Sequence, residues 1–254
     1  MSGGLTHRLH RPGDSPVHRL PAHVKVLALL AFVLVVVATP ADAFAAFAGY
    51  AVLLATAAAM AGVPGTVIAR RMVVEVPFVV FALLLPVLAG GPRVDVLGLS
   101  LSESGLLAGW NILAKGTLGV VASILLAATT DARSLLVGLA RLRVPARLVE
   151  IASFMVRYAD VVGDDLRRMR IARESRGFAP RHLGHARVVA QGAGALFIRS
   201  YERGERVHLA MLSRGYAGSM PLVDATPAAR ADWLRGTALP AAAVVIAVAT
   251  WALS

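Results

Sequence analysis

Two short segments of the chain share a pattern in which an arginine precedes a glycine and an aromatic residue. Residues 168–179 align with residues 206–217 at an offset of 38 positions, with arginine, serine, glycine and alanine in common. Arginine carries five donors in a planar fork that binds carboxylates and carbonyl groups bidentately. The chemistry that this pattern indicates is recognition of such groups on a partner. The residues that would provide it are Ser175, Arg176 and Gly177 in the first segment and Ser213, Arg214 and Gly215 in the second.

The same residue types have a simpler interpretation as the end of a helix. Glycine takes the left-handed conformation just past a helix, and a cation in the last turn complements the helix dipole. Capping alone would explain a single copy. Two near-copies, each ending a long helix, instead favour arginines held at rigid tips that enter grooves on a partner.

The sequence offers little for catalysis or for holding a cofactor. It has no nucleophile–base arrangement and no phosphate-binding G-x-x-x-x-G-K-[ST] segment, and its only lysines are Lys25 and Lys115. We therefore expect no enzyme activity and no cofactor, with any ATP energy supplied by another chain. Metal binding is not expected either, because a transition-metal site needs converging ligands with fixed neighbours. The histidines set aside on this ground are His7, His10, His18 and His23 in the polar lead and His182 and His185 in a proline- and glycine-containing loop.

The composition indicates a membrane protein. Of the 254 residues, 57% are hydrophobic and 16% are charged, and the mean hydropathy is +0.69, whereas about 25% of the residues of a soluble domain are charged. The absence of cysteine excludes a disulfide-stabilised scaffold. The 26 basic residues outnumber the 15 acidic ones, for a net charge of +11, which is typical either of nucleic-acid binding or of the cytoplasmic loops of a membrane protein.

Five apolar stretches are long enough, with their flanks, to cross the hydrocarbon core in about 20 residues. The predicted fold is therefore all-α, with about five transmembrane helices. Two charged residues lie inside spans, where charge is costly. Glu75 is one turn from the edge, where its side chain could reach the interface, and Lys115 lies nearer the middle and could pair with Glu75. The predicted spans cover residues 24–39, 43–62, 72–89, 105–128 and 238–254.

The distribution of the positive charges predicts the orientation of these spans. Residues 129–237 hold 18 of the 26 basic residues and the first 25 residues hold four more, whereas the 90–104 loop holds only Arg93. Loops rich in lysine and arginine stay in the cytoplasm. We therefore expect a cytoplasmic N-terminus, an extracytoplasmic C-terminus, a plasma-membrane location and no nucleic-acid partner.

The first apolar stretch has a second interpretation, as a secretory signal. A basic polar lead, an apolar run and small residues near positions 41–43 also fit a signal with its cleavage site. Its removal would upset the charge pattern that sets the orientation, so we prefer the interpretation as a span.

Residues 129–237 contain no clean span and instead predict long amphipathic helices. Apolar positions from Ile151 to Met169 recur close to every 3.6 residues, opposite a charged face. Arg203, in the middle of a charged stretch, is expected to matter less than the arginines of the triplets. Proline and glycine breaks divide the region into helices at about 131–143, 146–176 and 186–214. The chain would thus comprise a cytoplasmic lead (1–23), four spans (24–128), cytoplasmic coupling helices (129–237) and the last span (238–254).

With these features the chain resembles the transmembrane T component of energy-coupling factor (ECF) transporters over nearly its whole length. The paired triplets look like the two Ala-Arg-Gly signatures of that family, with serine in place of alanine. The segments from Asp14 to Lys25 and from Phe154 to Phe178 look most like the CbiQ family, the T components of cobalt transporters.

The resemblance implies a transmembrane coupling subunit without catalytic activity. Two cytoplasmic ATP-binding-cassette ATPases would receive one helix end each, through Arg176 and Arg214, with Gly177 and Gly215 ending the helices. Closure of the ATPases would move the helices and reshape a separate substrate-binding membrane subunit, the S component, which would be CbiM-like. The substrate would be cobalt, with nickel or a vitamin as alternatives. Outside this family, an integral membrane enzyme or a scaffold with a basic cytoplasmic face remains open.

Overall fold

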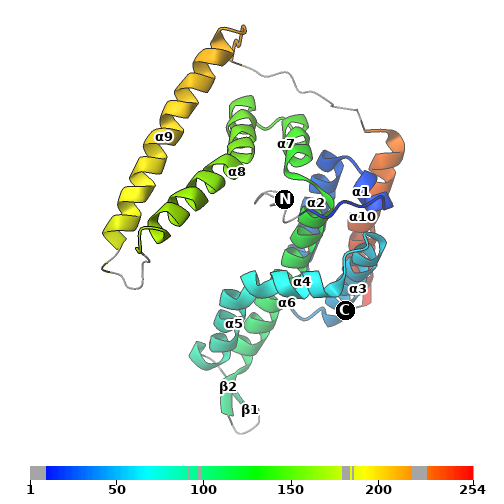
Figure 1. Ribbon diagram of the computed structural model, residues 1–254. Coiled ribbons are helices and arrows are strands. Elements are labelled where there is room, and N and C mark those ends of the chain that lie inside the picture. The colour runs from blue at the N-terminus through cyan, green and yellow to red at the C-terminus, as the bar shows by residue number, and fades with distance from the viewer. Residues whose placement is uncertain are drawn as a thin grey trace. The chain divides into compact units, whose positions relative to one another are not determined.

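The computed structural model describes residues 10–90, 92–96, 99–178, 184, 186–218 and 228–253. Most of these residues are helical (Figure 1). They divide into two compact units. The first, which we name the helical bundle, comprises the described residues of 10–138 and 228–253, and the second, the long-helix pair, comprises those of 139–218.

The five predicted apolar stretches are all helical, and they lie in the helical bundle. The segment Gly65–Leu88 and the helices α6 and α10 are long and apolar enough to cross a membrane. The helices α2 and α3 are apolar and have 17 residues each, the lower end of the range for a span. The all-α membrane fold is therefore confirmed. The elements of the bundle are α1 (Pro16–Arg19), α2 (Ala22–Ala38), α3 (Phe44–Met60), α4 (Gly65–Arg71), the 3-10 turn η2 (Met72–Glu75), α5 (Val76–Leu88), α6 (Glu103–Thr129) and α10 (Arg230–Leu253).

Two helices begin earlier than the apolar stretches that predicted them. The helical segment over the third apolar stretch extends back from η2 into α4. The 3-10 turn directly precedes α5, whose first turn contains Pro77. Proline is tolerated there because the first amides of a helix have no intrahelical acceptor. The last helix begins at Arg230 and not at residue 238, since its polar first turns carry no apolar signal.

The core of the bundle is formed by α2, α3, α6 and α10. Phe32 of α2 and Tyr50 of α3 are fully buried, and their rings pack edge to face. The small residues of α3 let the neighbouring helices approach closely. The Tyr50 hydroxyl lies 2.9 Å from the hydroxyl of Thr39, which satisfies a polar atom that would otherwise be stranded in the core. Large apolar side chains on α5 and α10 point outward, as expected of helices that face lipid.

Close approach of α5 and α6 depends on two glycines of α6. A Cβ atom added to Gly109 would lie 2.6 Å from the carbonyl oxygen of Ala82, and one added to Gly105 would lie 2.7 Å from that of Leu85. No real side chain fits at such distances, so glycine fixes the separation of these two helices.

The two charged residues inside the apolar stretches do not pair with each other. The Lys115 ammonium donates to the backbone oxygen of Val37 at 2.8 Å. Glu75 is only 3% exposed and accepts a hydrogen bond from the hydroxyl of Thr117. The expected Glu75–Lys115 pair is therefore not formed, and Glu75 does not extend to an interface, because the helix turns its side chain toward α6.

A short β-hairpin connects α5 and α6, where the sequence indicated only a loop. Strands β1 (Arg93–Val96) and β2 (Leu99–Ser102) pair antiparallel, with Arg93 opposite Ser102. Ser102 then caps α6, because its hydroxyl accepts a hydrogen bond from the amide of Gly105 at 3.3 Å. The hairpin thus places the first turn of α6.

Candidate partner-docking site

The candidate site lies at the ends of α8 (Ala146–Glu174) and α9 (Ala186–Leu212). Both helices match the predicted ranges closely, as does α7 (Ala132–Arg141), which precedes them. In the long-helix pair, α8 and α9 run side by side in opposite directions (Figure 1). Because each rises 1.5 Å per residue, the pair is about 40 Å long. The two Ser-Arg-Gly triplets therefore lie at opposite ends of the pair.

Each triplet closes its helix with the same set of backbone hydrogen bonds. Gly177 (φ 77°) and Gly215 (φ 82°) both occupy the left-handed region. The amides of Gly177 and Phe178 donate to the carbonyls of Glu174 and Arg173 at 3.0 and 3.1 Å. The equivalent amides of Gly215 and Tyr216 donate to Leu212 and Met211, both at 3.0 Å. This is the Schellman closure, so the predicted role of the glycines as helix ends is confirmed.

The serines of the triplets are satisfied inside their own helices. The Ser175 hydroxyl donates to the carbonyl of Ala172 at 3.1 Å, and the Ser213 hydroxyl donates to that of Ala210 at 3.0 Å. A hydroxyl bonded back to its own helix adds little to the shape of the tip. The departure from Ala-Arg-Gly therefore leaves the two tips intact.

The two tip arginines have donors to offer. Arg176 and Arg214 are exposed, and within the described part of the chain neither guanidinium has an ion pair or a hydrogen bond. Four other arginines of α8 and α9 do pair with carboxylates. Those pairs are Arg168–Asp165, Arg170–Glu174, Arg203–Asp165 and Arg206–Glu202.

Two side-chain contacts join α8 to α9 and to the residues that follow α9. Arg203 donates to the Asp165 carboxylate at 2.9 Å, with both side chains at least partly buried. The Tyr216 hydroxyl donates to Glu150 at 2.8 Å, and this hydrogen bond raises the pKa of Tyr216. Arg203 thus bridges the two helices, a role that the sequence did not indicate, while its smaller effect on partner docking stays a prediction. Sequence reasoning also missed the contact of Tyr216, since 66 residues separate the partners.

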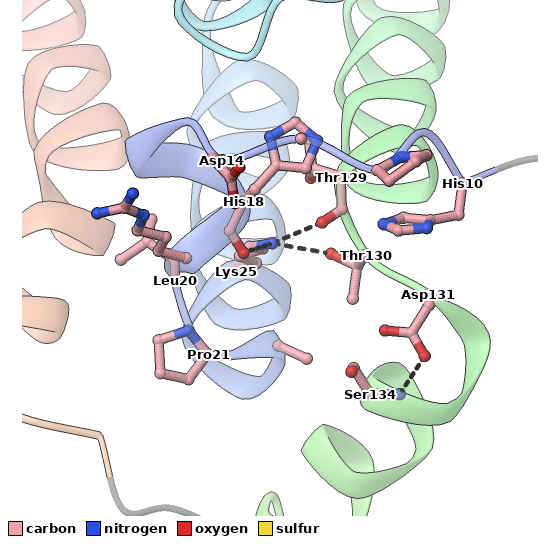
Figure 2. A pocket seen from close by; sticks show the side chains of 14 residues that line it. His10, Asp14, His18, Leu20, Pro21, Lys25, Thr129, Thr130, Asp131 and Ser134 are labelled. Carbon is pink, nitrogen blue, oxygen red and sulfur yellow. Dashed lines mark hydrogen bonds between the residues drawn. The ribbon is translucent and has the colours of Figure 1, made fainter.

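A second polar cluster gathers the N-terminal segment against the end of α6 in the helical bundle (Figure 2). The amide of Arg11 donates to the carbonyl of Ala128 at 2.9 Å. The buried Lys25 ammonium donates to the carbonyls of Thr129 and His18 and to the hydroxyl of Thr130, at 2.8, 3.2 and 3.2 Å. The segment is thereby integrated into the bundle.

His18 organises the turn that leads into this cluster. Its Nε2 lies 3.1 Å from the carbonyl oxygen of Arg11, which can only accept, so Nε2 carries the proton. Its Nδ1 forms a hydrogen bond with the Ser15 hydroxyl at 2.8 Å, and Ser15 in turn caps α1 by accepting from the amide of His18. The residues between Asp14 and Lys25, which carry part of the family resemblance, therefore have a structural role. The one sequence signal for this role is Ser15 followed by Pro16, a pattern typical of a helix start.

One acidic residue in the cluster is held in its charged form. Burial by itself would raise the pKa of Asp131, but hydrogen bonds from Ser134 and from its own backbone, with a contribution from His10, lower it overall. Asp131 accepts from the amide of Ser134 at 3.1 Å and so caps the first turn of α7.

The histidines do not assemble into a ligand set in the described ranges. Among those residues there is no group of three or more His, Cys, Asp or Glu side chains that could hold a metal ion. His7, His182 and His185 lie outside the described residues.

The comparisons with known proteins concern both the N-terminal cluster and the helix tips. The model of the family described as cobalt transport protein CbiQ matches residues 13–223. Over 110 residues the chain is 36% identical to the cobalt transport protein CbiQ of Rhodobacter capsulatus, an alignment that covers 41% of this chain and 43% of that protein. Over 106 residues it is 31% identical to an uncharacterized protein of Methanocaldococcus jannaschii, covering 42% and 40%. Each alignment thus spans less than half of the relative.

The family match runs from the turn before α1 to beyond the second helix tip. It therefore takes in α2 to α6, the long-helix pair and both Schellman closures, which are the features that the sequence pattern singled out. An all-α protein with several apolar helices fits a transport protein of the membrane. The chain belongs to the CbiQ cobalt transport protein family.

Proposed function

We propose that this chain is the coupling (T) subunit of an ECF-type transporter for cobalt uptake. In this role it passes the ATP-driven motion of two cytoplasmic ATPases to a substrate-binding membrane subunit. The observation that carries the proposal is the pair of identical helix ends, each presenting one arginine without a partner in the described residues. The name of the Rhodobacter relative supports cobalt over nickel or a vitamin.

A third helix end argues that capping does not account for the tip arginines. Helix α7 closes with the same bonds, since Arg143 donates to Ala140 and Val144 donates to Leu139. There the left-handed position holds Arg143 (φ 61°), and the residue before it, which corresponds to Arg176, is Leu142. A Schellman closure therefore forms in this chain without Arg at that position, so Arg176 and Arg214 are better explained by a partner.

The separation of the two tips supports two ATPase subunits. The tips end an antiparallel pair of helices about 40 Å long, which is too far apart for one groove. Each tip would place one guanidinium fork against acidic or carbonyl groups of its own ATPase. The rigid pair formed by α8 and α9 would then transmit the relative motion of the two ATPases.

The sides of α8 and α9 support contact with a further subunit. Phe197, Tyr201 and Leu209 of α9 and Met155 of α8 each expose at least 60% of their surface. Large apolar side chains exposed to this degree are typical of an interaction surface. We assign it, together with the small residues at 190–195, to the substrate-binding subunit.

The proposed orientation predicts the outcome of a reporter-fusion experiment. Because the basic loops are expected in the cytoplasm, a reporter inserted at Gly184 should be cytoplasmic and one fused after Ser254 should be extracytoplasmic. Alkaline phosphatase and green fluorescent protein fusions measure the two locations. Finding both reporters on one side would overturn the five-span arrangement.

The proposal assigns ATP hydrolysis and substrate binding to other subunits, and this predicts the behaviour of the purified chain. Because the sequence has no phosphate-binding loop, the isolated protein should hydrolyse no ATP, and it should retain no cobalt after washing. Phosphate release and metal analysis test this. Stoichiometric cobalt on the isolated subunit would contradict the assignment of substrate binding to another chain.

A further inference from the structure

Two cavities in the helical bundle meet at a shared wall. One is polar, has a volume of about 590 Å³, and is lined by the N-terminal segment, the start of α2, the end of α6 and the residues that follow it (Figure 2). The other is an apolar groove of about 320 Å³ whose lining comes from α1, α2, α3, α6 and α10. Leu20, Lys25 and Thr129 line both. Together they form one amphipathic recess, polar at one end and apolar at the other.

The shared wall contains a buried positive charge, Lys25, which interacts electrostatically with the Asp131 carboxylate but forms no ion pair with it. Lys25 is 8% exposed, and its three hydrogen bonds go to two carbonyls and one hydroxyl, all of them neutral. In the described residues no carboxylate lies within ion-pair distance of its ammonium. Buried charges in proteins are usually paired with an opposite charge. The recess therefore favours an anion.

Two more cations border the recess. Arg19 lines the polar cavity and Arg235 lines the apolar groove, and both side chains are exposed with no ion pair or hydrogen bond in the described part of the bundle. Two carboxylates, those of Asp14 and Asp131, also line the polar cavity, and Asp131 is engaged with the amide of Ser134. Three cations (Arg19, Lys25 and Arg235) and two acids thus line the two cavities.

We propose that this recess binds one phospholipid with an anionic headgroup. The phosphodiester would lie near Lys25, Arg19 and Arg235, and one acyl chain would fill the groove between α3 and α10. The groove is lined by the start of α2 and α10 and by the end of α3 and α6, and we place its opening in the hydrocarbon of the adjacent leaflet. Each methylene that enters it is removed from any contact with water, and the phosphate gains Arg19 and Arg235, which form no ion pair in the described part of the bundle.

A phospholipid fits this recess better than a free phosphate does. Inorganic phosphate would use the cations and leave the groove empty, whereas a neutral lipid would fill the groove and leave Arg19 and Arg235 without an anion. Only an anionic amphiphile satisfies both ends. The proposal depends on the membrane location of the chain and not on its coupling role.

The experiment is native mass spectrometry of the purified full-length chain in detergent. The probes are dioleoyl phosphatidylglycerol, dioleoyl phosphatidylcholine and inorganic phosphate. We expect one phosphatidylglycerol to be retained per chain in preference to phosphatidylcholine. Arg19→Gln with Arg235→Gln should reduce that preference by about fivefold for each arginine, or roughly thirtyfold together. Ala57→Phe, which fills the groove, should reduce the retention of both lipids.

The matched control is Arg133→Gln, because Arg133 is an exposed arginine of the same unit that lines neither cavity. It should retain phosphatidylglycerol like the unchanged chain. Equal retention of the two lipids, displacement of the lipid by inorganic phosphate, or equal loss in the control would each overturn the proposal. Melting temperatures measured without added lipid identify any variant that fails to fold. If the arginine variants fail to fold, lipid retention by Ala57→Phe tests the groove without changing any charge.

Discussion

Replacing Arg176 and Arg214 together by glutamate is expected to release both ATPases while the apolar helices still insert in the membrane. Each substitution removes a guanidinium from a partner groove and places a carboxylate against acidic groups there. Removing one partner of a buried charged pair costs on the order of 2–5 kcal/mol, which is roughly 30-fold to a few thousandfold in affinity. Each single variant should weaken co-purification of the ATPases, and the double variant should abolish it together with cobalt uptake.

The structure supplies matched controls for this experiment. Arg167 on α8 and Arg199 on α9 are exposed and have no ion pair within the described ranges, so Arg167→Glu and Arg199→Glu change the same charge away from the tips. Arg203 is unsuitable because it bridges to Asp165. If the tip arginines served only to complement the helix dipole, the variants would lose about 0.3–1 kcal/mol of local stability. Normal ATPase recovery by the double variant would contradict docking.

Replacing Lys25 by methionine is expected to lower the melting temperature of the purified chain by about 5–10 °C. Methionine keeps the length of the side chain but leaves three acceptors at the end of α6 and at His18 without their donor. Unsatisfied buried acceptors cost about 1–3 kcal/mol each, offset in part because the buried charge is also removed. A net loss of about 2–3 kcal/mol corresponds to this shift for a chain of such length.

The other lysine of the chain is the natural control. Lys115 donates one hydrogen bond, to Val37, and Lys115→Met should therefore shift the melting temperature by less than Lys25→Met. Thermal unfolding in detergent, followed by circular dichroism or by a fluorescent dye, measures both variants. An unchanged melting temperature for Lys25→Met would show that the N-terminal cluster does not stabilise the bundle.

The elements that the sequence predicted are those with a local cause. An apolar run forms a helix in a membrane whatever surrounds it, because its backbone groups must bond to one another there. The ends of α8 and α9 were equally local, since Gly177 and Gly215 determine the closure within a few residues. For the same reason α7, α8 and α9 lie within a few residues of their predicted ranges.

The features that the sequence did not reveal depend on distant partners or on weak patterns. Lys25 meets Thr129 across 104 residues, and Arg203 meets Asp165 across 38. Neither spacing has a period that could be detected in one sequence. The hairpin at Arg93–Ser102 did carry a signal, because apolar and polar residues alternate there.

Glu75 illustrates how burial changes the interpretation of a charged residue in a span. The position of Glu75 one turn from the end of its span suggested that its side chain reaches the membrane–water interface. The helix instead turns Glu75 toward Thr117, where it is almost fully buried. The direction of a side chain around a helix decides such cases, and it depends on the packing of neighbours that hydropathy does not describe.

Site-directed cross-linking tests most directly whether the two tips dock into two ATPases. The sequence contains no cysteine, so Ser175→Cys or Ser213→Cys introduces a single thiol next to Arg176 or Arg214. A thiol-attached photoactivatable probe is used in the complex co-expressed with its ATPases, with Arg167→Cys and Arg199→Cys as controls. We predict that each tip variant cross-links to an ATPase and that the controls do not. Cross-links from the control positions with none from the tips would contradict the proposed function.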